Sequence, residues 1–220
     1  MERLRNRDDA GERLSRLLAP FFEESRADAP PVVLGLARGG VPVAAGIARR
    51  LGLPLDVIVV RKLGAPADPE FGFGAIGEDV RVLDAAAMEV LGITGEDLAA
   101  VESAERAELA RRLTAYRAVR PALPLAGRTA IVVDDGIATG GTARAAALVA
   151  RAKGATRVIL AAGVAAPDSL AALMRDGSVD HALAAVIPDA LHSVGEWYED
   201  FAQTPDDEVV RLLTLGLGDS

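Results

Sequence analysis

Two adjacent carboxylates and the glycine- and threonine-rich turn after them form the segment with the clearest chemistry. The apolar run 130–133 leads into Asp134 and Asp135, and G-I-A-T-G-G-T follows. A turn that opens a helix offers backbone N–H groups and a partial positive charge, which suits a phosphate. Carboxylates at the end of a strand lie where doubly wound sheets bind ligands, and they accept hydrogen bonds from hydroxyls. The pattern predicts a sugar-phosphate site; the alternative is that Asp135 only caps a turn.

Two common nucleotide-binding motifs do not account for these residues. No Lys precedes Thr142, so the turn is not a P-loop. Residues 72–77 match G-x-G-x-x-G, but they follow D-P-E-F rather than an apolar strand and precede E-D-V-R-V-L-D rather than a helix. The dinucleotide interpretation therefore fails on context.

Composition excludes several other classes of protein. The 220 residues include 24 Lys and Arg, 32 Asp and Glu and no Cys, for a net charge of −8. Without Cys there is no disulfide, no thiolate zinc site and no cysteine nucleophile. The charge balance argues against nucleic acid as a partner. The sequence shows neither a membrane-spanning apolar run nor a signal-peptide pattern, so we expect a cytoplasmic protein without a membrane partner.

The elements that must position the acidic pair alternate along the chain. Five short apolar runs are typical of buried strands, at residues 31–37, 55–60, 130–133, 157–164 and 181–187. Helical patterns fall between them, at residues 41–51, 141–153 and 168–175. Near-continuous apolar strands that alternate with helices indicate a parallel sheet covered on both faces. We predict an α/β fold with a doubly wound, mainly parallel five-stranded sheet.

Two stretches interrupt this alternation. Residues 62–80 hold four glycines and two prolines and are predicted to form a long flexible loop. Residues 85–120 are predicted to be a helical insertion that Thr94 caps. The face opposite its partial apolar stripe is rich in Glu and Arg, which is typical of a solvated surface rather than a binding surface. An alternative interpretation treats the long helix at 95–120 as an oligomerisation element. With a C-terminal hood or tail at about 187–220, these segments make one domain over residues 1–220.

Three segments, in order, carry a resemblance to type I phosphoribosyltransferases. V-V-D-D-G-I-A-T-G-G-T at 132–142 resembles the family's phosphoribosyl pyrophosphate loop, and G-L-A-R-G-G at 35–40 resembles its pyrophosphate loop. V-R-K at 60–62 resembles the basic pair of adenine-type members, and W-Y-E-D-F-A-Q at 197–203 is similar to the C-terminal element of a bacterial group in the family. The resemblance covers about residues 30–190. It implies transfer of ribose 5-phosphate from phosphoribosyl pyrophosphate to a nitrogenous base, with release of pyrophosphate.

The resemblance also implies a role for each matching residue. Asp134 and Asp135 would bind the ribose hydroxyls, directly or through Mg²⁺ and its waters. Arg38, with the backbone of Gly39 and Gly40, would receive the pyrophosphate. The 5-phosphate would be held by backbone N–H groups and hydroxyls of the turn, at Ala138, Thr139, Gly140, Gly141 and Thr142.

Two basic residues complete the implied machinery. Arg61 and Lys62 would neutralise the departing pyrophosphate, and loop 64–80 would close over the reacting centre. Lys62 is one of only two lysines in the chain, and its alternative interpretation is a surface side chain beyond a strand end. Ala138 stands where hypoxanthine and guanine enzymes have Asp, which argues against their base chemistry. Residues 6–8 match the amino-terminal D-R of the bacterial group only imperfectly.

The acceptor base stays unnamed. Trp197, Tyr198 and Phe201 are three of the eight aromatic residues, and one of their rings could stack on a base. The alternative is that they fix a C-terminal helix to the core, and His181 and His192 are interpreted as structural. A non-catalytic regulatory protein that binds phosphoribosyl pyrophosphate or a nucleotide is the second candidate function, and a homo-oligomer is compatible with both.

Overall fold

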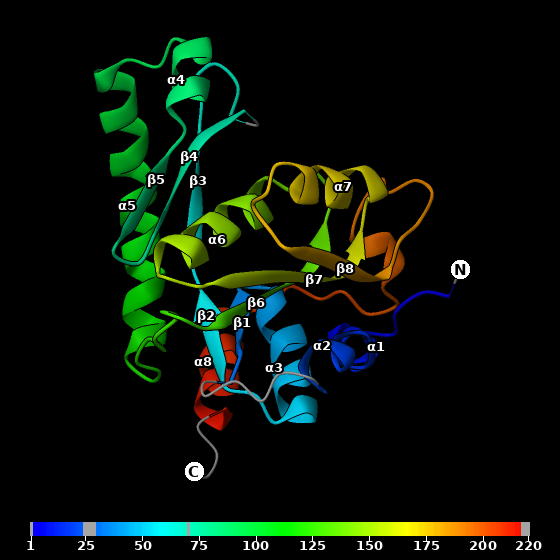
Figure 1. Cartoon of the computed structure of the whole chain (residues 1–220). Coiled ribbons are helices and arrows are strands. Elements are labelled where there is room, and N and C mark those ends of the chain that lie inside the picture. The colour runs from blue at the N-terminus through cyan, green and yellow to red at the C-terminus, as the bar shows by residue number, and fades with distance from the viewer. Residues whose placement is uncertain (1, 24–29, 70, 217–220) are drawn as a thin grey trace.

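Five apolar strands form the central sheet, and all of their pairings are parallel. The computed structural model describes residues 2–23, 30–69 and 71–216, and Figure 1 shows its arrangement. The strands are β1 (Val32–Leu36), β2 (Leu55–Ile58), β6 (Thr129–Ile137), β7 (Arg157–Ala165) and β8 (His181–Val186). Their order is β2-β1-β6-β7-β8. The winding reverses between β1 and β6, which is where doubly wound sheets bind ligands. The predicted fold class is confirmed.

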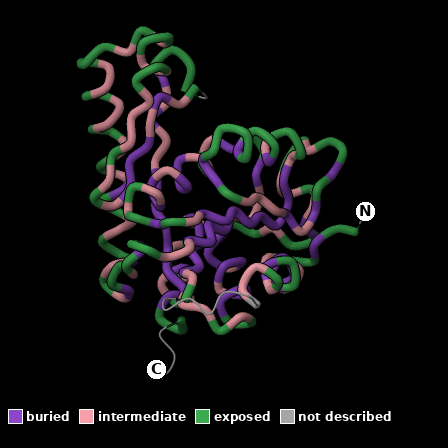
Figure 2. The backbone as a smooth tube through the Cα atoms, in the orientation of Figure 1, coloured by how far each residue is buried: buried purple, intermediate pink, exposed green. Residues whose placement is uncertain are grey.

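Helices cover both faces of this sheet because alternate side chains of each strand point to opposite sides. Val33 and Ile131 belong to one buried cluster, whereas Val32 and Val132 belong to the other. On the first side lie α1 (Arg7–Leu18), α2 (Pro20–Glu23) and α3 (Gly40–Leu51), and on the second lie α6 (Gly141–Ala152) and α7 (Pro167–Arg175). The last helix, α8 (Asp206–Leu215), packs against α3 and the edge strand β2. In Figure 2 the buried residues concentrate in the strands between these layers.

A second sheet replaces most of the predicted flexible loop at 62–80, so that prediction is wrong. Strands β3 (Val60–Gly64), β4 (Gly72–Gly77) and β5 (Val80–Leu83) pair antiparallel and take up most of this stretch. The glycines permit close packing here. A Cβ on Gly74 would lie 2.6 Å from the carbonyl oxygen of Val82, and one on Gly77 would lie 2.6 Å from Cγ1 of Val149. Glycine in this hairpin therefore marks close contact between elements rather than mobility.

The helical insertion at 85–120 is confirmed as α4 (Ala85–Leu91) and α5 (Gly95–Arg117). Thr94 caps α5 in a reciprocal arrangement, in which the N–H of Asp97 donates to the Thr94 hydroxyl and the Asp97 carboxylate accepts from the N–H of Thr94. The small sheet packs between α5 and α6, and this unit projects upward beside the central sheet in Figure 1. None of the helices in the described part of the chain is long and apolar enough to cross a membrane.

Segments near the two ends of the described chain meet beside β6. The N–H of Leu4 donates to the carbonyl of Trp197 at 2.8 Å, and the N–H of Glu199 donates to the carbonyl of Leu4 at 2.8 Å. Residues 187–205 contain the short 3₁₀ helix Gly195–Trp197 and run past Gly136, where a Cβ would clash with the side chain of Val194. The predicted hood therefore contacts the carboxyl end of β6; residues 217–220 of it lie outside the described residues.

Candidate functional site

The acidic pair lies near the carboxyl end of β6, where the sequence pattern places it. Asp134 and Asp135 are half-buried, and the N–H of Asp135 donates to Oδ1 of Asp134 at 2.9 Å. Burial raises the pKa of Asp134, and the negative charge of Asp135 raises it further. Two adjacent carboxyl groups do not readily carry a negative charge at the same time. A bound cation or a set of hydroxyl donors would stabilise the ionised pair.

Arg7, in the first turn of α1, fixes the carboxylate of Asp135. Its Nε and Nη2 both donate to Oδ2 of Asp135, at 2.9 and 2.7 Å, so Oδ1 receives neither of these bonds. Its Nη1 donates to the carbonyl of Ala202 at 2.7 Å, and its guanidinium lies 4.2 Å from the ring centre of Phe201. The Asp135 carboxylate is therefore held by Arg7 through one of its two oxygens.

Tyr198 fixes the backbone of the same residue. Its hydroxyl donates to the carbonyl of Asp135 at 2.6 Å, and its ring stacks on Phe201 with centroids 4.8 Å apart. A Cβ on Gly163 would collide with the Tyr198 oxygen, so only glycine at that position of β7 admits this contact. Burial raises the pKa of the Tyr198 hydroxyl, which stays a protonated donor. Tyr198 therefore has a structural role, although it holds β6 in place rather than a C-terminal helix.

Of the remaining aromatic and histidine candidates, Phe201 lies at a pocket, whereas Trp197, His181 and His192 do not line it. Phe201 lines an open pocket beside Arg7, whereas Trp197 packs against the hydrophobic core. His192 is exposed and is not among the residues that line this pocket. Nε2 of His181 lies 2.8 Å from Nη2 of Arg157, and its ring meets Phe21 edge-on, contacts that fit the structural interpretation.

The loop after β1 approaches the acidic pair closely enough to require glycine. A Cβ on Gly39 would collide with Oδ2 of Asp135, and one on Gly40 would collide with the carbonyl oxygen of Val133. The peptide between Ala37 and Arg38 is cis. Parallel neighbours β1 and β6 thus bring the predicted pyrophosphate loop and the predicted ribose-binding acids into direct contact.

The predicted phosphate turn lies at the start of α6, as expected. Gly140 has φ +84°, a left-handed conformation that glycine adopts without strain, and α6 begins at the next residue. Ala138 and Thr139 are exposed, and Thr142 is exposed as well. The hydroxyl of Ser169 donates to the carbonyl of Ala138 at 2.5 Å and ties the turn to α7. The turn therefore combines a fixed backbone with open access to solvent.

The side chains of Arg61 and Lys62 lie on opposite faces of strand β3. Successive residues of a strand point to opposite sides, so Arg61 of β3 pairs with Glu105 of α5, whereas Lys62 lies against α6. A Cβ on Gly141 would lie 3.3 Å from Cδ and 3.7 Å from Nζ of Lys62. The structure thus brings Lys62 to the phosphate turn and places Arg61 on the opposite side of the strand.

An open pocket of about 440 Å³ lies next to Asp135, and the phosphate turn and Lys62 are not part of its lining. It is lined by Arg7, Arg38, Gly39, Arg112, Asp135, Phe201, Gln203 and Thr204. Sequence reasoning missed Arg112, which the Glu- and Arg-rich face of α5 concealed, and assigned no role to Arg7. A signal for Arg7 existed: Asn6 caps α1 by accepting from the N–H of Asp9 at 3.0 Å, so Arg7 had to lie in a first helical turn.

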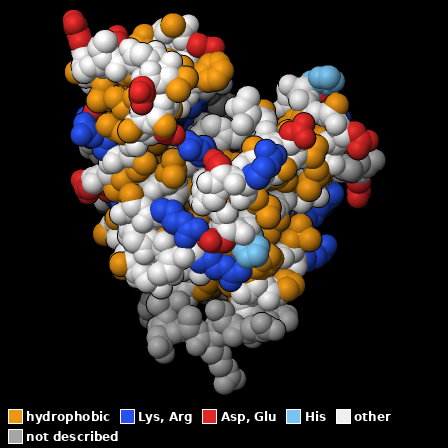
Figure 3. Space-filling model, turned by 45° about the horizontal axis from the view of Figure 1, so that its top comes forward, with side chains coloured by type: hydrophobic (Ala, Val, Ile, Leu, Met, Phe, Trp, Pro, Cys, Tyr) orange, Lys and Arg blue, Asp and Glu red, His pale blue; other side chains and the backbone are white. Residues whose placement is uncertain are grey.

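Basic side chains do not form one continuous field on the face of the molecule that Figure 3 draws. On the face drawn in Figure 3, Lys and Arg side chains lie in several separate groups, interleaved with acidic and apolar ones. Arg7, Arg38 and Arg112 all line one pocket, together with the acidic residue Asp135.

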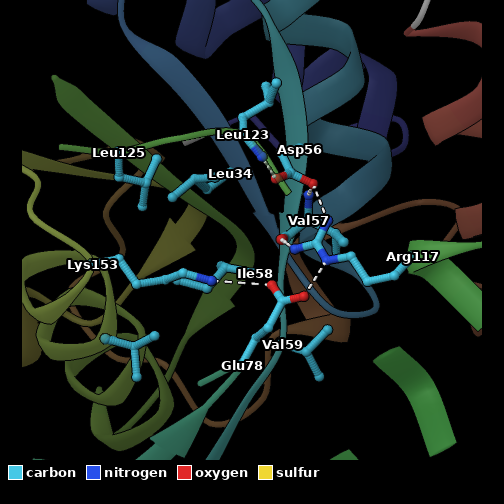
Figure 4. A pocket seen from close by; sticks show the side chains of 11 residues that line it. Leu34, Asp56, Val57, Ile58, Val59, Glu78, Arg117, Leu123, Leu125 and Lys153 are labelled. Carbon is cyan, nitrogen blue, oxygen red and sulfur yellow. Dashed lines mark hydrogen bonds and ion pairs between the residues drawn. The ribbon is translucent and has the colours of Figure 1, made fainter. Parts of the chain in front are cut away.

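A second cluster of charges lies at the amino end of the sheet and has a structural character. Arg117 of α5 donates to Asp56 at 2.7 Å and to Glu78 at 2.8 Å, and Lys153 donates to Glu78 at 3.1 Å (Figure 4). Oδ2 of Asp56 accepts from the N–H of Leu123 at 2.9 Å. The cavity among them is only about 20 Å³, so these side chains satisfy one another and leave no room for a ligand.

Comparison with known proteins finds relatives of almost the whole chain. A sequence profile of the phosphoribosyl transferase domain matches residues 8–176. Two proteins of Mycobacterium tuberculosis, from strains CDC 1551 and H37Rv, are provisionally named phosphoribosyl transferases. Each is 46% identical over 212 residues, which is 94% of this chain, and the chain spans only 46% of the length of each.

A solved structure is similar over its full length. The crystal structure of the protein TT1426 from Thermus thermophilus matches with a TM-score of 0.87 at 40% sequence identity. The match covers 97% of this chain and 98% of that chain, so the small sheet and the insertion lie within the shared architecture together with the central sheet.

Proposed function

Because this chain belongs to the phosphoribosyl transferase domain family, we propose that it transfers the ribose 5-phosphate unit of phosphoribosyl pyrophosphate to a nitrogenous base and releases pyrophosphate. One observation carries this proposal. The Arg38–Gly40 loop contacts the acidic pair, and the phosphate turn follows that pair by a few residues. Groups suited to a pyrophosphate, two ribose hydroxyls and a phosphate thus lie along one edge of the sheet.

Each part of the substrate has a matching set of protein groups. The 5-phosphate is placed in the turn from Ala138 to Thr142, against backbone N–H groups at the start of α6. The ribose hydroxyls donate to the carboxylates of Asp134 and Asp135. The pyrophosphate lies against Arg38 and the backbone of Gly39. Lys62, beside Gly141, adds positive charge next to the phosphate turn.

The acidic pair also fits Mg²⁺. This ion prefers oxygen ligands, keeps several waters, and is commonly held by one or two carboxylates together with substrate phosphates. Asp134 and Asp135 supply two carboxylates, and the described residues contain no group of three or more potential metal ligands that would hold an ion without the substrate. Mg²⁺ bound there would neutralise charge on the pyrophosphate.

The reaction needs placement and charge rather than a covalent nucleophile. The bond from the anomeric carbon to pyrophosphate breaks and its electron pair leaves with the pyrophosphate. A base nitrogen forms the new bond and gives its proton to the released pyrophosphate or to solvent. Positive charge develops on the ribose, where the carboxylates of Asp134 and Asp135 stabilise it. Arg38 stabilises the negative charge on the leaving group. Phe201 and Gln203 line the same pocket and offer a ring face and an amide to an acceptor.

Direct binding tests this proposal. We expect calorimetry to detect phosphoribosyl pyrophosphate binding in the presence of Mg²⁺, and binding to weaken when EDTA removes the ion. A panel of nitrogenous bases should then release pyrophosphate from the complex, measured by a coupled assay. If calorimetry shows no binding of phosphoribosyl pyrophosphate at millimolar concentrations with Mg²⁺, the proposed function is wrong.

Arg7→Met is expected to weaken phosphoribosyl pyrophosphate binding by about tenfold or more, because a charge-assisted hydrogen bond contributes about 1.5–3 kcal/mol and Asp135 would lose two of them. Arg7→Lys should restore part of the affinity, since it keeps the charge but not the fork geometry. Arg16→Met is the control: Arg16 lies on the same helix, 72% exposed, and pairs with Glu12. Equal affinities for Arg7→Met and Arg16→Met would remove Arg7 from the site.

A further inference from the structure

Three guanidinium groups from distant parts of the chain converge on the open pocket. Arg7 comes from α1, Arg38 from the loop after β1, and Arg112 from the inserted helix α5. Arg112 belongs to neither of the loops that the sequence motifs identify. Its side chain is 19% exposed, so it is largely enclosed by the protein rather than extended into solvent.

Among the residues that line this pocket, three arginines face a single carboxylate. Asp135 is engaged by Arg7, and the single carboxylate of Glu108 is shared, because Arg111 contacts it at 2.9 Å and Arg112 at 2.7 Å. Asp135 is also the only acidic residue among those that line the pocket, all of which belong to the described part of the chain. Like charges that face one pocket without enough counter-charge favour a bound oxyanion.

Arg112 is also held in place. Five residues beyond it, Arg117 anchors α5 to Asp56 and Glu78. The hydroxyl of Tyr116 donates to Oδ1 of Asp206 at 2.5 Å, and Nη1 of Arg111 donates to Oδ2 of Asp206 at 3.2 Å. The carboxyl-terminal half of α5 is therefore fixed to the body of the molecule on two sides. A cation at position 112 is positioned before any ligand arrives, which lowers the entropic cost of binding.

We propose that Arg112 is a pyrophosphate ligand, acting across the pocket from Arg38 and the backbone of Gly39. This inference rests on the proposed function and extends it, because it assigns part of the pyrophosphate site to the helical insertion. Nε of Arg112 donates to Glu108, and the remaining N–H donors of the guanidinium can contact phosphoryl oxygens. Pyrophosphate carries charge on both phosphoryl groups, so it can engage two guanidinium groups at once, whereas a single phosphate in the turn does not need the second.

Calorimetry with inorganic pyrophosphate and Mg²⁺ tests the assignment. We expect Arg112→Gln to weaken pyrophosphate binding by about tenfold or more, the usual size of a lost hydrogen bond to a charged group. Arg112→Lys should fall between that variant and the wild type. Binding of inorganic phosphate, which the proposed function assigns to the turn at the start of α6, should change less than about twofold, the usual scale for a substitution away from the site. The ratio of the two affinities within one variant therefore separates local loss from general unfolding.

The matched control is Arg106→Gln. Arg106 lies on the same helix and bonds Glu102 four residues earlier at 2.8 Å, as Arg112 bonds Glu108, but it is half exposed and does not line the pocket. Equal pyrophosphate affinities for Arg112→Gln and Arg106→Gln would overturn the inference, as would an equal loss of phosphate and pyrophosphate binding in Arg112→Gln. A wild-type protein that binds neither pyrophosphate nor phosphoribosyl pyrophosphate would instead overturn the proposed function, and the inference with it.

Discussion

Replacing both Asp134 and Asp135 with Asn should weaken phosphoribosyl pyrophosphate binding at least about a hundredfold while leaving the fold intact. The variant removes the carboxylate acceptors that face the ribose hydroxyls, and each charge-assisted hydrogen bond lost costs about 1.5–3 kcal/mol. Asn retains the shape of Asp, so packing in β6 is preserved. Calorimetry at fixed Mg²⁺ measures the loss, and circular dichroism checks the fold.

The melting temperature of the single variant Asp134→Asn adds a second measurement to this test. Burial and the charge of Asp135 raise the pKa of Asp134, so the ionised form of Asp134 destabilises the folded protein. Because this folded-state pKa lies above the unfolded value, stability is lost as pH rises through that interval. Asp134→Asn removes the effect and should melt at the same temperature as the wild type or higher near neutral pH. Unchanged binding of phosphoribosyl pyrophosphate in the double variant would place the substrate elsewhere.

Arg117→Ala is expected to destabilise the protein by about 3–5 kcal/mol, because removing one partner leaves buried charges uncompensated. Asp56 is only 2% exposed, and Glu78 is also largely buried. At roughly 2–4 °C per kcal/mol for a chain of this size, the melting temperature should fall by about 6 °C or more. Thermal unfolding followed by circular dichroism measures this loss.

An exposed ion pair on the same helix supplies the comparison for Arg117. Arg106 is 50% exposed beside Glu102, and Arg106→Ala should cost less than about 1 kcal/mol, as is usual for pairs in solvent. Burial raises the pKa of Glu78, but hydrogen bonds from Arg117 and Lys153 lower it by more. The pKa of Glu78 therefore lies below its ordinary value. If Arg117→Ala and Arg106→Ala lower the melting temperature equally, the network in Figure 4 does not anchor α5.

The central sheet was predictable because its strands are buried on both faces. Val132 and Val133 point to opposite sides and both lie in apolar surroundings, so this part of the sequence is an uninterrupted apolar run. Gly140 and Thr142 were equally informative, since a turn that opens a helix has a local pattern. The acidic pair at the end of such a strand had to lie at the ligand-binding edge of the sheet.

The hairpin and the arginine cluster were not predictable by the same means. Glycines at positions 74 and 77 suggested mobility, but they accommodate Val82 and Val149, contacts that only the folded chain reveals. Arg7 contacts Asp135 across 128 positions of sequence, and no local pattern encodes such a pairing. Arg112 has the same local surroundings as the exposed arginines of its helix, so only the packing of α5 distinguishes it.

The contacts around Asp135 also have a consequence for the order of events during synthesis. Its carboxylate is held by Arg7, which leaves the ribosome 128 residues earlier, and its carbonyl by Tyr198, which follows 63 residues later. Chains fold from the amino terminus as they emerge. A nascent chain can therefore already contain β1, β6 and α6, with both predicted ligand loops exposed, while Asp135 is still held on one side only. The second contact that holds Asp135 can therefore form only after Tyr198 has been synthesised.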